Sequence, residues 1–167
     1  MWFSGVEQLR QLEVTEDEVN QIVLARQAGI SGQSCLDLVL LARRRGQPFN
    51  DGQAIAGLMR AGFQESSVMA LARLNQLGIR AGEAQAMRLA GLSDDVVLAV
   101  ARRRNAGLPV LSSFKAAELR NAGLTDKQIL DAVNRGTTDA QADAIIAQRN
   151  RAAGGHHFVR QSGARRR

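Results

Sequence analysis

The residues Ala122-Gly123-Leu124-Thr125-Asp126-Lys127-Gln128-Ile129 form the clearest copy of a short motif that predicts the fold of this chain. An Ala-Gly pair is followed by a hydrophobic residue, a polar residue and the start of a new apolar segment. Glycine readily adopts the left-handed backbone conformation that ends a helix, and the threonine two positions later can cap the next one. The spacing Thr125-x-x-Gln128 matches a capping box. The motif therefore predicts a helix end and a new helix start in close succession.

The same motif recurs along the chain at intervals of about 30 residues, which is typical of helical repeat proteins. The other copies are Ala28-Gly29-Ile30-Ser31, Ala61-Gly62-Phe63-Gln64, Ala90-Gly91-Leu92-Ser93, and an earlier copy without the Ala-Gly pair that opens at Val14-Thr15. In every copy the hydrophobic residue has an apolar partner five positions later, the spacing of a hydrophobic staple. These pairs are Val14 with Val19, Ile30 with Cys35, Phe63 with Val68, Leu92 with Val97, and Leu124 with Ile129.

A second glycine divides each repeat into two helices. These glycines, expected to end the first helix of each repeat, are Gly46, Gly78, Gly107 and Gly136. The shorter second helices are predicted over residues 51–61, 82–90, 112–122 and 138–152. Helix pairs of this size must stack to bury their apolar faces. The sequence thus predicts an all-α fold of tandem helical hairpins, stacked as a short α-solenoid or a compact multi-helix bundle.

Charge separates the body of the chain from its C-terminal end. The net charge is +6, yet residues 1–148 hold 16 basic and 16 acidic side chains. All of the excess is carried by Arg149, Arg151, Arg160, Arg165, Arg166 and Arg167, in a stretch without acidic residues. We therefore predict a helical-repeat domain over residues 1–152 and a basic, disordered tail over residues 153–167.

Arginine also clusters within the body, at the ends of two predicted helices. Basic residues at a helix C-terminus are favoured by the helix dipole, which accounts for these clusters without any ligand. Aligned by stacking, they would instead form a basic ridge continuous with the tail. The candidate contacts to nucleic acid or an acidic partner are Arg43, Arg44, Arg45, Arg102, Arg103, Arg104, Arg160, Arg165, Arg166 and Arg167.

The sequence contains no pattern of residues that indicates catalysis. Phosphate-binding glycine loops and nucleophile motifs are missing, and one cysteine cannot form a zinc site or an internal disulfide. Cys35 lies among apolar residues, as expected of a small core side chain. The adjacent His156 and His157 have no further ligands nearby. We predict a protein that is not an enzyme and has no cofactor or metal.

Two functions remain open at this stage. The repeat favours an interaction module that binds a protein or peptide, by analogy with other stacked helical repeats. The alternative is association with nucleic acid or another acidic surface through the arginine-rich tail and clusters. With no signal peptide and no apolar run long enough to cross a bilayer, a cytoplasmic location is expected.

Overall fold

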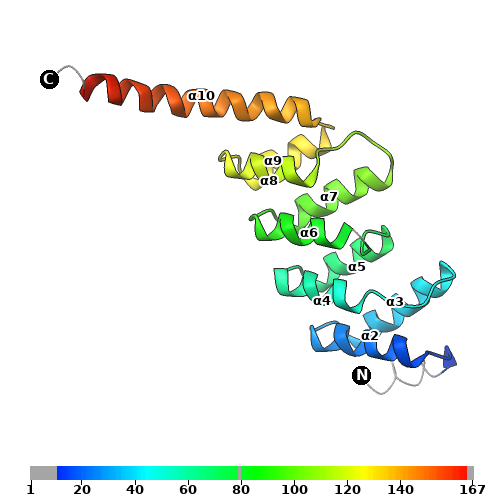
Figure 1. The fold of residues 1–167 in the computed structure, drawn as a ribbon. Helices are drawn as coiled ribbons and strands as arrows, with labels where there is room; N and C mark the ends of the chain where they lie inside the picture. The colour runs from blue at the N-terminus through cyan, green and yellow to red at the C-terminus, as the bar shows by residue number, and fades with distance from the viewer. Residues whose placement is uncertain (1–10, 79, 165–167) are drawn as a thin grey trace. The chain divides into compact units, whose positions relative to one another are not determined.

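The computed structural model describes residues 11–78 and 80–164, with residues 154–164 described by their backbone alone. This part of the chain is all-helical and contains no strand. Its helices are α2 (Glu16–Gln27), α3 (Gly32–Arg44), α4 (Gly52–Ala61), α5 (Glu65–Arg73), α6 (Arg80–Leu89), α7 (Asp94–Asn105), α8 (Ser113–Asn121), α9 (Asp126–Asn134) and α10 (Asp139–Ala164) (Figure 1). The predicted all-α class is confirmed.

The helices form two compact units, Met1–Leu89 and Ala90–Arg167. In the first unit α4 packs between α2 and α6, while α3 packs on α5, so alternate helices build two layers. In the second unit α7 packs on α9 and α8 on α10. This is the stacking of tandem hairpins that the repeat predicts. The boundary predicted between residues 152 and 153 is not tested by this division and stays a prediction.

The Ala-Gly motif forms the predicted turn at each of its copies. Its four glycines have φ between 95° and 106°. The side chains of three polar residues cap the helices that follow, by accepting a hydrogen bond from a backbone N–H three residues on: Ser31, Ser93 and Thr125. Thr125 with Gln128, and Thr15 with Glu18, complete capping boxes. The motif therefore fixes the local structure as its residue types require.

The staple pairs account for much of the core. Both members are buried in four of the five pairs, Ile30 with Cys35, Phe63 with Val68, Leu92 with Val97, and Leu124 with Ile129. The fifth pair differs, because Val19 is 46% exposed. Val19 lies on α2. This helix packs against α4 and belongs to the layer of α4 and α6, the second helices of their hairpins. Among the described residues, α2 is thus the second helix of a hairpin and not the first helix that the motif at Val14-Thr15 predicts.

The second turn of each repeat contains one departure from expectation. Gly46, Gly107 and Gly136 have positive φ as predicted, but Gly78 does not. Asn75 takes that role with φ 57°, and α5 ends three residues before the position that Gly78 suggested. Gln76 N–H bonds Leu71 O at 2.9 Å, as Gln47 N–H bonds Ala42 O at 3.0 Å, so both turns are the same. Asparagine is the residue after glycine that best tolerates this conformation.

Substitutions at Asn75 should reveal this backbone requirement. We expect Asn75→Val to lower the free energy of unfolding by about 1–2 kcal/mol, because a branched side chain is strained at positive φ. Asn75→Gly should leave stability within about 0.5 kcal/mol of the wild type or raise it. Urea unfolding followed by circular dichroism measures both. Equal losses in the two variants would show that the asparagine side chain, not the backbone, matters.

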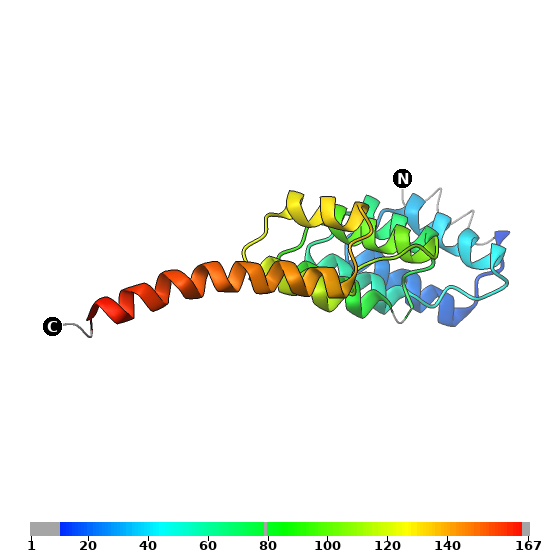
Figure 2. The ribbon, with the colours of Figure 1, turned by 90° about the horizontal axis from the view of Figure 1, so that it is seen from above.

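The last helix is longer than predicted. Instead of ending near residue 152, α10 continues to Ala164, over 26 residues. Gly154 and Gly155 weaken a helix by about 1 kcal/mol each but do not remove a backbone hydrogen bond as proline would. Figure 2 shows that α10 runs beyond the other helices of its own unit. Whether the basic segment from residue 153 acts as a separate tail stays a prediction.

Candidate functional site

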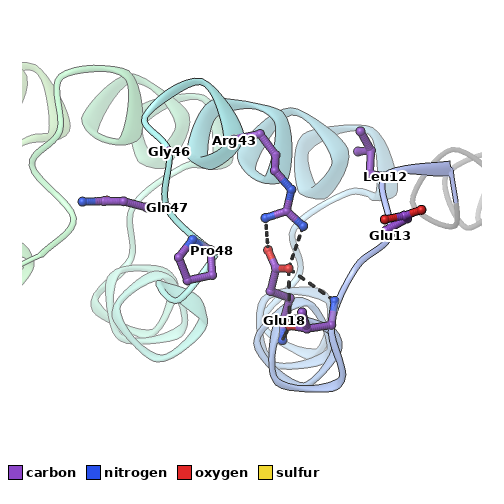
Figure 3. A pocket seen from close by; sticks show the side chains of 8 residues that line it. Leu12, Glu13, Glu18, Arg43, Gly46, Gln47 and Pro48 are labelled. Atoms are coloured by element: carbon purple, nitrogen blue, oxygen red, sulfur yellow. Dashed lines mark hydrogen bonds and ion pairs between the residues drawn. The ribbon is translucent and has the colours of Figure 1, made fainter.

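The first arginine cluster contains a buried ion pair. Arg43 near the end of α3 donates from Nη1 and Nη2 to the two carboxylate oxygens of Glu18, each at 2.7 Å (Figure 3). Glu18 is 1% exposed, in the first turn of α2. The Phe49 N–H also donates to Glu18 Oε2 at 2.9 Å. The carboxylate thus joins α2 to α3 and to the loop that leads into α4.

These donors keep Glu18 ionised. The guanidinium of Arg43, helped by the backbone N–H groups of Phe49 and Thr15, lowers the pKa of Glu18 from 4.5 to about 2, although burial opposes the shift. A carboxylate with such a low pKa stays ionised at neutral pH and is a weak proton acceptor, whereas an efficient general acid or base has a pKa near the working pH. The pair therefore has the properties of a structural ion pair that stabilises the packing of α2 against α3.

Two further arginines of the clusters bind the ends of neighbouring helices. Arg45 donates from Nη2 to Ala72 O at 2.9 Å and to Arg73 O at 3.1 Å, at the C-terminus of α5. Arg103 donates to Pro109 O at 2.8 Å and to Asn134 O at 3.2 Å, the latter at the C-terminus of α9. A guanidinium there satisfies terminal carbonyls and opposes the negative end of the helix dipole.

The remaining predicted contact residues divide into three groups. Arg44 and Arg102 are exposed, and Arg104 is half-buried. Arg160, Arg165, Arg166 and Arg167 lie outside the residues whose side chains the structure describes. The two clusters belong to different units, so the predicted basic ridge stays a prediction.

Acidic residues hold successive repeats together in a way that sequence reasoning missed. Each is the first residue of a helix, and its carboxylate accepts a hydrogen bond from the backbone N–H of an earlier N-cap serine. The bonds are Ser31 N–H to Glu65 at 2.6 Å, Ser93 N–H to Asp126 at 2.9 Å, and Ser112 N–H to Asp139 at 2.8 Å. The hydrogen bond from Ser31 lowers the pKa of Glu65. The sequence signal was the spacing of about one repeat between each serine and its acid, which is hard to recognise because the helix dipole by itself favours acidic residues at helix starts.

A pocket of about 420 Å³ opens beside the Glu18–Arg43 pair (Figure 3). It lies where the chain leaves α3 and where it enters α2. Its lining residues are Leu12, Glu13, Thr15, Glu18, Arg43, Gly46, Gln47 and Pro48. The volume is in the range of small-ligand sites. No sequence pattern predicts this pocket, because its walls come from segments about 30 residues apart.

Other chemistry-bearing residues are accounted for by the fold. Cys35 is 1% exposed, as predicted, and burial raises the pKa of its thiol to about 11, which leaves it unreactive at neutral pH. Within the described residues, no group of three or more His, Cys, Asp and Glu side chains could hold a metal ion. In the same part of the chain, no helix combines the length and apolar character needed to cross a bilayer.

Comparison of the chain with known protein families, with curated proteins and with solved structures gives no match. The class of protein is therefore defined by its architecture, that of an all-α chain of tandem helical hairpins.

Proposed function

We propose that this chain is a non-catalytic helical-repeat module that binds a protein or peptide partner. The observation that carries the proposal is Phe114, near the N-terminus of α8, which is 68% exposed. Exposed aromatic side chains on rigid elements are frequent anchors of protein interfaces. Leu108 lies in the loop that precedes α8. It is 49% exposed and is a second exposed apolar side chain close to Phe114 in the sequence.

Charged side chains held by ion pairs lie next to Phe114. Lys115 Nζ lies 5.8 Å from the centre of the Phe114 ring. The same ammonium bonds Asp143 of α10 at 2.5 Å and Glu118 at 2.9 Å, and these two carboxylates raise its pKa. An aromatic side chain bordered by ordered charges has the composition of an interface centre and its polar rim.

Affinity capture with tagged variants tests the proposal. The full chain should capture a partner from cell extract, and Phe114→Ala should weaken that capture about tenfold or more, as loss of a central aromatic does. Leu89→Ala is the matched control, because Leu89 is 74% exposed but lies on α6 in the other unit. Equal capture by all three proteins would contradict the proposed role of Phe114.

A second function is favoured by a separate observation. Residues 149–167 carry six arginines and no acid, and α10, which holds three of them, projects past the other helices of its unit (Figure 2). Such a segment would attract nucleic acid through a salt-dependent, sequence-independent interaction. The cytoplasmic location expected from the sequence is compatible with both functions and stays a prediction.

Truncation to residues 1–152 separates the two functions. If the interaction module is correct, the truncated chain should fold and keep partner binding. If the basic segment binds nucleic acid, gel mobility of labelled DNA or RNA should shift only with the full chain, and the shift should weaken steeply from low to moderate salt. Binding that is insensitive to salt would contradict the nucleic-acid alternative.

A further inference from the structure

One turn in the second unit is bound by two arginines from different helices. Arg120 of α8 donates from Nη1 to Leu124 O at 3.4 Å, and Arg149 of α10 donates from Nη1 to Gly123 O at 3.3 Å. Gly123 and Leu124 are consecutive residues of the Ala-Gly turn that follows α8. Both guanidinium groups therefore lie at the C-terminal end of α8, on adjacent carbonyl groups.

The comparable turns of the first unit each hold one arginine and one methionine. At the turn of Gly29, Arg26 of α2 donates to a carbonyl of the turn at 2.6 Å, and Met59 reaches the glycine from α4. At the turn of Gly62, Met59 takes the first of these positions and Arg88 of α6 takes the second. One arginine is thus enough for the repeats to stack, and the turn after α8 has a second.

The two arginines at the turn after α8 are exposed, as is the glycine of the turn. Within the part of the chain whose side chains are described, neither Arg120 nor Arg149 forms an ion pair. Two acids of the same helices, Glu118 and Asp143, bind Lys115 instead. The two positive charges are therefore offset only in part, by the negative end of the α8 dipole.

This arrangement favours a planar anion. A guanidinium has five N–H donors, and the structure assigns one donor of each arginine to the turn. The remaining donors match the two oxygens of a carboxylate, and the second cation strengthens the attraction. An anion bound here would also offset the repulsion between two like charges at one turn.

We propose that Arg120 and Arg149 bind a carboxylate of an aspartate or glutamate side chain on the partner protein. This inference rests on the proposed function as a protein-binding module and names the chemistry of one contact. The exposed Phe114 lies on the same helix as Arg120, about 9 Å along its axis, so one partner can contact both.

An acidic side chain fits this surface better than a nucleic acid does. Exposed acids of the same unit, among them Asp131 of α9 and Asp143 of α10, repel the successive phosphates of an extended strand. A single carboxylate needs only the two arginines at the turn, together with apolar contacts such as Phe114.

Titration of the isotope-labelled full chain with the α-amide of N-acetyl-glutamate, at constant ionic strength and followed by NMR, tests the site without the partner. We expect saturable shifts of the Gly123 and Leu124 amide signals, and none with the uncharged N-acetyl-glutamine amide. Arg149→Ala should weaken binding about two- to fivefold, the scale of one exposed ion pair. Arg151→Ala is the matched control, because it removes an exposed positive charge from the same helix about 200° away around its axis.

Three outcomes would overturn the proposal. One is the absence of saturable shifts at this turn in the wild type. Another is an equal loss of binding in Arg149→Ala and Arg151→Ala, which would reflect only the overall charge of α10. The third is tighter binding of an oligothymidylate than of an oligoglutamate with the same number of charges, which would assign the site to nucleic acid. None of these outcomes changes the capture experiment with Phe114→Ala, so failure of this site and failure of the proposed function can be told apart.

Discussion

Leu119→Asp is expected to lower the free energy of unfolding by about 4 kcal/mol or more, which approaches the whole stability of many small domains. Leu119 is fully buried at 0% exposure on α8, which packs against α9 and α10. The substitution removes a large apolar side chain from the core and places an unpaired carboxylate there. Far-ultraviolet circular dichroism with thermal and urea unfolding measures the loss.

Phe114→Asp on the same helix is the matched control for this prediction. Phe114 is 68% exposed, and an acidic residue is favourable near a helix N-terminus, so stability should stay within about 0.5 kcal/mol. Similar losses in the two variants would contradict the placement of α8, because only one of its faces is buried in this fold.

Arg43→Ala is expected to cost about 3–5 kcal/mol, because it leaves the buried carboxylate of Glu18 without its guanidinium. Neighbouring Arg44 provides the control. Its side chain is exposed, so Arg44→Ala should change the free energy of unfolding by less than about 0.5 kcal/mol. Urea unfolding of both variants at neutral pH makes the comparison, and equal effects would show that the ion pair does not hold the unit together.

The dependence of stability on pH gives an independent test of the same pair. The pKa of Glu18 is lowered from 4.5 to about 2 in the folded protein, so its contribution is complete above pH 4.5 and is lost as the pH falls toward 2. A shift of this size corresponds to about 3 kcal/mol. Arg43→Ala should flatten this part of the curve, so that variant and wild type converge in acid. Parallel curves would contradict the assignment of the low pKa to Arg43.

Local structure was predictable from the sequence where a residue type strongly favours one backbone conformation or one capping role. The Ala-Gly turns, the serine and threonine caps and four buried staple pairs all follow from short-range backbone geometry. The turn at Asn75 was missed because both glycine and asparagine tolerate the left-handed conformation. The turn was therefore assigned to Gly78, three positions later. The end of α10 was missed because glycines weaken a helix without forcing it to stop.

The all-α class, the alternation of helices and turns, and the apolar side of most helices were predictable from the order of residues alone. These features depend on neighbours within about one helical turn, so a local pattern encodes them. The partners of the charged residues, in contrast, depend on how the helices stack. Arg43 pairs with Glu18, Arg45 donates to carbonyls at the end of α5, and Glu65 accepts a hydrogen bond from Ser31. These partners lie 25 to 34 positions apart along the chain. A charge run has the same appearance in sequence whether it faces solvent or a helix terminus, and only stacking brings these groups within hydrogen-bonding distance.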